Sequence, residues 1–122
     1  MPRGSDLAHF FDGRPEARTI FDALRSAVEE CGPATVHVSR SQVGFRRRRS
    51  FAAAWIPDRY LHGEHAPLVL TLFLPYRLDS QRFKEVVEPG PGRFTHHLEL
   101  GGPAEVDGEV RRLIRLAWEA AA

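Results

Sequence analysis

The stretch from Val43 to Ile56 reads V-G-F-R-R-R-R-S-F-A-A-A-W-I and places four consecutive arginines between two apolar runs. Two apolar runs of strand length, separated by a short polar segment, are typical of a β-hairpin. We expect one strand over Val43–Arg47 and its partner over Ser50–Ile56. In the second strand, Phe51, Ala53 and Trp55 should share one face and the intervening residues the other. The stretch therefore predicts a hairpin with a positively charged tip.

Further strands are expected on both sides of this hairpin. Thr35–Ser39 precedes it, and Leu68–Leu74, which follows it, is apolar at almost every position. A strand that is apolar on both faces belongs in the middle of a sheet, so we place Leu68–Leu74 there. Phe83–Glu88 and Arg93–Leu100 are a second hairpin candidate, because the intervening Pro89-Gly90-Pro91-Gly92 is a turn signal.

Helices are predicted near both ends of the chain. A short helix covers Asp6–Phe11, and the main N-terminal helix begins at Pro15 and is stopped by Gly32-Pro33. The last helix opens at Gly101-Gly102-Pro103, with Asp107 in its first turn. The main N-terminal helix has apolar residues at three- and four-residue steps, as on one buried face: Ala17, Ile20, Phe21, Leu24, Ala27, Val28 and Cys31.

This order of elements predicts an α+β fold. The simplest arrangement is a two-layer sandwich, in which an antiparallel sheet of about five strands is flanked by an N-terminal and a C-terminal helix. The 122 residues have the length of one domain, so we expect residues 1–122 to form a single α+β domain. Function is then expected on the face of the sheet that the helices leave open.

The composition is that of an ordinary globular protein, with 43% hydrophobic and 27% charged residues. Seventeen basic and sixteen acidic side chains leave a net charge of +1. Such a balance argues against a protein that mainly wraps nucleic acid, so a nucleic-acid partner is not favoured. The single cysteine, Cys31, cannot form an internal disulfide, and no apolar run approaches the ~20 residues of a membrane span. We expect a cytoplasmic protein without a membrane partner.

The run Arg46–Arg49 is the first candidate for chemistry. Guanidinium groups at a hairpin tip can bind phosphate or carboxylate oxygens in pairs. The alternative is that neighbouring arginines point to opposite sides of the strand and solvate a turn. Phe45 and Phe51 flank the run, which indicates that it is built into the sheet.

The second candidate is the segment Arg93-Phe94-Thr95-His96-His97. On a strand, Arg93 and His97 share the polar face, whereas His96 lies among apolar residues on the other. A histidine can act as a general base near neutral pH, because its ordinary pKa is about 6.5. A structural histidine, hydrogen-bonded to a neighbouring strand, is the competing interpretation. We assign no catalytic residue, and whether the protein is an enzyme stays open.

Metal and cofactor sites are not expected. His62 and His65 lie in a loop, and neither they nor His96-His97 have the spacing of a zinc site. Cys31 is on the apolar face of a helix, where a thiol is inert. A phosphate-binding glycine loop is also not expected, because prolines interrupt the Pro89–Gly92 segment where N–H groups would be needed.

Several segments together resemble a family of bacterial domains of unknown function, the one numbered 5655. The resemblance extends from about Leu7 to Trp118, and its most specific parts are Gln42 with Phe45-Arg46, and the segment Phe94–His97. It implies an uncharacterised, compact α+β domain that occurs alone or joined to larger proteins. It implies no activity, cofactor or site residue.

We therefore expect an anionic ligand, bearing a phosphate, nucleotide or carboxylate group, to bind at the arginine-rich hairpin and the adjoining sheet face. One alternative is a protein-interaction or dimerisation module, in which the arginines pair with carboxylates of a protein partner or a second copy. The other is a small enzyme that uses a strand histidine as its general base. The residues expected to bind the ligand are Gln42, Arg46, Arg48, Lys84, Arg93 and His97.

Overall fold

The computed structural model describes residues 4–59 and 63–122; His62, considered above as a metal ligand, lies outside them. These residues form three α-helices, two short 3₁₀ turns and six strands. In chain order the elements are α1 (Gly4–Phe10), α2 (Pro15–Cys31), β1 (Thr35–Val38), β2 (Val43–Arg46), β3 (Ser50–Trp55), η1 (Pro57–Arg59), β4 (Leu68–Leu74), β5 (Glu85–Gly90), β6 (Arg93–Leu100), η2 (Pro103–Glu105) and α3 (Gly108–Ala120). The predicted α+β fold, with an antiparallel sheet and helices near both ends of the chain, is confirmed.

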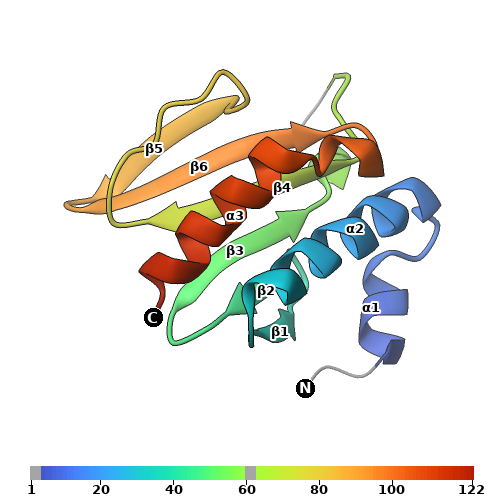
Figure 1. Ribbon diagram of the computed structural model, residues 1–122. Helices are drawn as coiled ribbons and strands as arrows, with labels where there is room; N and C mark the ends of the chain where they lie inside the picture. The colour runs from blue at the N-terminus through green and yellow to red at the C-terminus, as the bar shows by residue number, and fades with distance from the viewer. Residues whose placement is uncertain (1–3, 60–62) are drawn as a thin grey trace.

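The six strands form one sheet in the order β1-β2-β3-β4-β6-β5, and all neighbours are antiparallel (Figure 1). The six strands correspond to the six strand ranges predicted above, so the expected total of about five was one too low. The strand Leu68–Leu74 lies in the middle, as predicted. β5 lies at the far edge beyond β6, so the segment 75–84 must cross β6 to reach it; we call this segment the strap.

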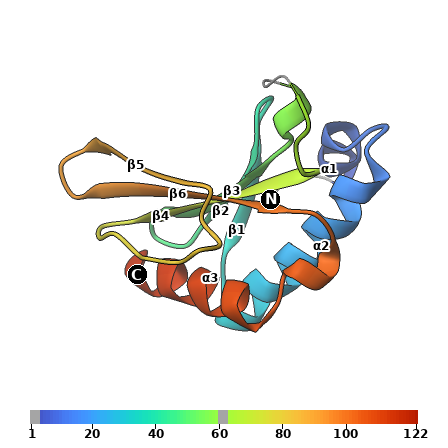
Figure 2. The same cartoon turned by 90° about the horizontal axis from the view of Figure 1, so that it is seen from above.

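Helices α2 and α3 cover one face of the sheet (Figure 2). The register places Ala52, Leu72 and His96 in one row across β3, β4 and β6, and this row faces the helices. The adjacent row, Ala53, Thr71 and His97, points away from them because successive side chains of a strand alternate. We call the side that carries this second row the open face.

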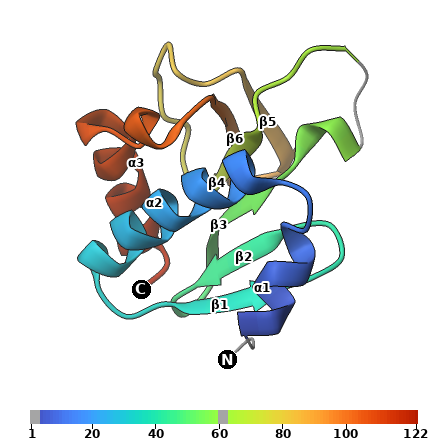
Figure 3. The same cartoon turned by 90° about the vertical axis from the view of Figure 1, so that its right-hand side faces the viewer.

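The helix-side core is built from the apolar face predicted for α2. Phe21 stacks on Phe45 of β2 with 5.8 Å between ring centroids, and Phe45 in turn packs near Phe51. Helix α1 packs beside β1, at the edge of the sheet (Figure 3). No helix in the described ranges is long and apolar enough to cross a membrane.

Three local expectations were wrong. Phe51 does not share a face with Ala53, because β3 has a bulge opposite Phe45 and Arg46 that turns Phe51 into the core. The last helix begins at Gly108 rather than near Gly101, because the Asp107 side chain accepts the Val110 N–H over 3.1 Å and caps the helix there.

The third difference concerns β5, which spans Glu85–Gly90 instead of Phe83–Glu88. Gly90 still pairs with Arg93, so the hairpin turn between them contains only Pro91 and Gly92. Gly92 has a positive φ of 70°, a conformation that glycine adopts without the strain of a Cβ atom.

Candidate functional site

A hydrogen-bonded network lies at the centre of the open face. The indole Nε1 of Trp55 donates to Oγ1 of Thr71 over 2.9 Å, and the same oxygen lies 2.8 Å from Nδ1 of His97. The Trp55 and His97 rings are nearly perpendicular, at 88°, with centroids 6.1 Å apart. Because each hydrogen bond orients one ring, both rings are positioned before a ligand arrives.

Thr71 also determines which nitrogen of His97 is left for a ligand. The Thr71 side chain is buried, its oxygen accepts the indole proton, and its own hydroxyl proton requires an acceptor. Nδ1 of His97 is within reach of this hydroxyl, so Thr71 occupies that nitrogen and leaves Nε2 for a ligand. Burial lowers the pKa of His97 from its ordinary value of 6.5, and the negative charge of Glu85 only partly opposes this. His97 is therefore a neutral imidazole at pH 7.

The network lines a shallow hollow of about 350 Å³, which we call the central hollow. Its walls combine three aromatic rings, from Trp55, Phe73 and His97, with hydroxyl and amide groups. Two of the polar residues, Ser41 and Gln42, come from the turn between β1 and β2. The full lining is Ser41, Gln42, Trp55, Thr71, Phe73, Thr95 and His97.

A second hollow, of about 560 Å³, adjoins the central hollow because Phe73 and Thr95 line both. We call it the arginine hollow. Arg49 enters it from the β2–β3 hairpin tip and Arg93 from the start of β6. Neither side chain makes a hydrogen bond or an ion pair with another residue in the ranges 4–59 and 63–122. Two arginines from segments distant in the sequence thus line one hollow, together with Phe73, Thr95 and the end of β4.

A third hollow, of about 270 Å³, shares Trp55 and His97 with the central one and contains Lys84. The Nζ atom of Lys84 lies 3.0 Å from a carboxylate oxygen of Glu99, whose other oxygen accepts the Ala66 N–H over 3.0 Å. The Ala66 N–H, followed by Lys84, holds the pKa of Glu99 below its ordinary value. The charge of Lys84 is therefore already matched by a carboxylate.

The predicted site residues are thus distributed over the open face. Gln42 and His97 line the central hollow, Arg93 the arginine hollow and Lys84 the third hollow. The remaining two predicted residues, Arg46 and Arg48, are exposed but line none of the three.

The four arginines of the hairpin have different surroundings. The guanidinium of Arg47 lies over the Trp118 ring at 3.5 Å from its centroid and donates to the Trp118 carbonyl over 3.2 Å. The backbone N–H of Arg48 donates to the Ala121 carbonyl, so the hairpin tip is attached to the end of α3. A cation at the C-terminus of a helix is favourable. Arg47 is therefore structural, and Arg49 is the member of the run that lines the arginine hollow.

His96, on the other face of β6, has a structural environment. Its side chain is fully buried, with 0% exposed. The backbone N–H of Leu78 in the strap donates to Nε2 over 2.9 Å, and the Phe83 ring packs 4.8 Å away. Nδ1 is buried without a hydrogen-bond partner among the described residues. Burial lowers the pKa of His96, since a charged ring would lose its hydration there.

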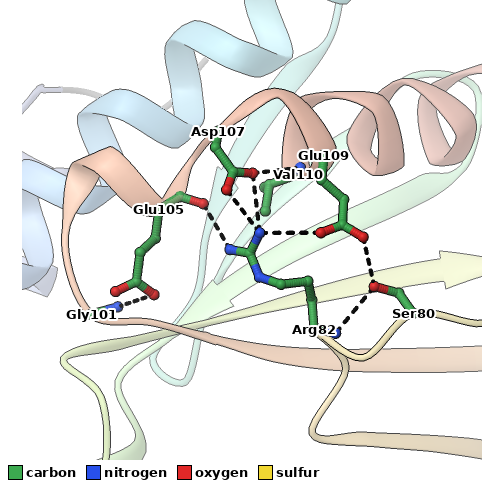
Figure 4. A network of polar contacts seen from close by, with 7 residues as sticks. All are labelled: Ser80, Arg82, Gly101, Glu105, Asp107, Glu109 and Val110. Atoms are coloured by element: carbon green, nitrogen blue, oxygen red, sulfur yellow. Dashed lines mark hydrogen bonds and ion pairs between the residues drawn. The ribbon is translucent and has the colours of Figure 1, made fainter.

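The strap is attached to the beginning of α3 by Arg82 (Figure 4). Its guanidinium donates to both carboxylate oxygens of Asp107, at 3.1 and 2.9 Å, and to Glu109 at 3.3 Å. It also donates to the Glu105 carbonyl over 3.1 Å, while Ser80 donates to Glu109 over 2.9 Å. Every partner belongs to the strap or to the α3 region, so this cluster has a structural role.

Sequence reasoning missed Thr71 and Trp55 as site residues, and it named Arg49 within the candidate run but did not select it. Thr71 did carry a signal, because it is the only polar residue within the apolar run Leu68–Leu74. The described part of the chain contains no group of three or more His, Cys, Asp or Glu residues arranged to hold a metal ion.

Together, these features define an α+β domain whose antiparallel sheet has helices on one face and an aromatic, partly basic surface on the other. The chain belongs to the family described as a domain of unknown function, DUF5655, whose sequence model matches residues 8–121. The resemblance stated above is thereby confirmed. No curated protein and no solved structure gives a significant match to the chain.

Proposed function

We propose that the open face binds a small anionic ligand, with its negative group between Arg49 and Arg93. The observation that carries this proposal is that these two arginines line the same hollow, without a carboxylate among its described lining residues. Guanidinium groups whose charge has no internal partner are well suited to bind phosphate or carboxylate oxygens. The hydroxyls of Ser50 and Thr95 can supply further hydrogen bonds there.

This proposal changes the predicted residue set. Arg93, His97 and Gln42 remain candidates, because they line the adjoining arginine and central hollows. Arg49 takes the place of Arg46 and Arg48. Lys84 has a smaller expected role, since Glu99 already balances its charge.

Thermal unfolding with a panel of anions tests the proposal. The panel contains inorganic phosphate, citrate, succinate, ribose 5-phosphate and AMP, each at a constant ionic strength. A ligand at a hundred times its dissociation constant stabilises the folded state by about 2.7 kcal/mol, which raises the Tm by several degrees. We expect at least one anion to raise the Tm of the wild type and to lose this effect in an Arg49→Gln, Arg93→Gln double variant.

The matched control is an Arg46→Gln, Arg48→Gln double variant, which removes the same amount of charge from arginines outside the arginine hollow. It should keep the wild-type response. If both double variants lose the response equally, the effect comes from net charge and the assigned hollow is wrong. The absence of any response to the whole panel contradicts anion binding at this face.

A second candidate function, general-base catalysis, is supported at His97 only. Its neutral ring lies beside two hollows, and Thr71 orients it, whereas His96 is sealed below the strap. Once an anion that binds has been found, its turnover by the wild type and by His97→Gln can be compared by NMR. Turnover that depends on His97 at unchanged affinity supports catalysis, and the absence of turnover in the wild type contradicts it.

A further inference from the structure

The chemical character of the open face changes along its length. The central hollow has three rings, from Trp55, Phe73 and His97, and the arginine hollow has two cations. Since Phe73 and Thr95 belong to both hollows, a single ligand can occupy the two at once. Such a ligand would have a flat ring at one end and a negative group at the other.

We propose that this ligand is a nucleotide, whose base lies in the central hollow and whose phosphate lies between Arg49 and Arg93. The inference rests on the proposed function and specifies its ligand class. A base presents a flat π-surface that stacks on aromatic side chains, which a purely aliphatic anion cannot use. The two hollows, about 350 and 560 Å³, have the size of small-molecule sites.

The polar groups of the central hollow suit the edge of a base. Ser41 has a hydroxyl and Gln42 an amide, so together they offer both donors and acceptors. Nε2 of His97 can make a further hydrogen bond, because Thr71 occupies Nδ1. The perpendicular Trp55 and His97 rings form a corner in which a base can stack on one ring and meet the edge of the other.

The same chemistry can come from a free nucleotide or from one unit of a short single strand. Aromatic residues on an open antiparallel sheet, with arginines beside them, can hold a few nucleotides of a single strand. The net charge of +1 argues against a protein that wraps a long nucleic acid, but it is compatible with a contact to a few nucleotides. The experiment therefore includes both sources.

Tryptophan fluorescence provides the test. The chain has two tryptophans, so a Trp118→Phe variant leaves Trp55 as the only reporter. Trp118 is on α3 and contacts Arg47, away from the open face. We titrate this variant with AMP and with adenosine, and use ribose 5-phosphate as a competitor that has no base. AMP should quench Trp55 with saturation, and loss of either the phosphate or the base should weaken binding by about tenfold or more.

Two further substitutions locate the phosphate. In the same background, Arg49→Gln should weaken AMP binding about tenfold while leaving adenosine binding unchanged. Arg48→Gln, one residue earlier in the same turn, should alter neither. Equal losses in the two variants would overturn the assigned phosphate position.

The outcomes separate this inference from the proposed function. If ribose 5-phosphate binds as tightly as AMP, the nucleotide assignment is wrong while anion binding stands. If neither AMP nor any simple anion binds, both are wrong. An octauridylate that binds at least ten times more tightly than UMP, with an affinity that falls as salt rises, identifies a single strand as the source. Equal affinities for octauridylate and UMP identify the free nucleotide as the source. Both results support the inferred chemistry.

Discussion

The two faces of β6 place adjacent histidines in opposite environments. His96 points toward the helices, is fully buried and accepts a hydrogen bond from the strap. His97 points to the open face and lines two hollows. Burial lowers the pKa of both rings. The difference is access, because only His97 can meet a ligand, and residue type alone therefore does not identify a functional histidine.

The largest effect expected from this comparison concerns two neighbours on β4. Leu72 is fully buried against the helices, whereas Phe73 lies half-buried in the open face. Leu72→Ala should lower the free energy of unfolding by about 3 kcal/mol, through lost burial and a cavity. Phe73→Ala should cost only about 1 kcal/mol, because its ring is already partly in water. Urea denaturation of both variants measures the two costs, and equal costs would contradict the assignment of an open face.

The next effect concerns the strap that seals His96. Arg82→Ala removes charge-assisted hydrogen bonds to Asp107 and Glu109 and the bond to the Glu105 carbonyl. Because the cluster is partly exposed, we expect a loss of only about 1 to 2 kcal/mol in the free energy of unfolding. Ligand binding at the open face should not change.

The control for this substitution is Arg77→Ala, in the same strap. Arg77 lies 3.9 Å from Asp79, and their side chains are 58% and 99% exposed. Such a pair contributes close to nothing, so its removal should leave the urea midpoint unchanged. A similar loss in both variants would show that Arg82 acts through general charge rather than through its contacts.

Alternation along the strands predicted much of this comparison. Successive side chains of a strand point to opposite sides, so alternation assigns His96 to the apolar face and His97 to the polar face of β6 without the strand register. The apolar composition of Leu68–Leu74 likewise indicated the middle of the sheet. These features depend on local sequence only.

The site itself depends on contacts that the local sequence does not determine. Residues 47–49 leave the strand, so alternation from Arg46 could not show that Arg49 reaches a hollow while Arg47 stacks on Trp118. Arg93 lines the same hollow as Arg49 only because β6, and not β5, pairs with β4. Strand order and register are long-range properties, and a strand that pairs out of chain order leaves no local signal.

The arginine run provides a smaller test of the division between faces. Arg47→Ala should lower the free energy of unfolding by about 0.5 to 1 kcal/mol, because it removes the stacking on Trp118 at an exposed site. Arg49→Ala should leave the stability unchanged in the absence of ligand and should weaken anion binding. Urea midpoints and anion titrations are measured for both variants. If the faces are separate, Arg47→Ala changes only the stability and Arg49→Ala changes only the anion affinity. Loss of anion binding in Arg47→Ala at unchanged stability would contradict the division of the arginines between the two faces.

The smallest effect is a change in how stability depends on pH. The pKa of His96 is lower in the folded than in the unfolded protein, so at mildly acidic pH the unfolded chain binds more protons. The stability that this neutral ring contributes is complete above the unfolded value of about 6.5 and decreases as the pH falls through that value toward the folded pKa. In His96→Gln, the new amide oxygen can still accept the Leu78 N–H bond, but the side chain cannot be protonated. Urea denaturation at pH 7.5 and pH 5.5 measures how much the free energy of unfolding decreases on acidification. This decrease should be smaller in His96→Gln than in the wild type. In His97→Gln, the contribution of His96 to the decrease should remain. An unchanged pH dependence in His96→Gln would show that the strap does not keep this ring neutral.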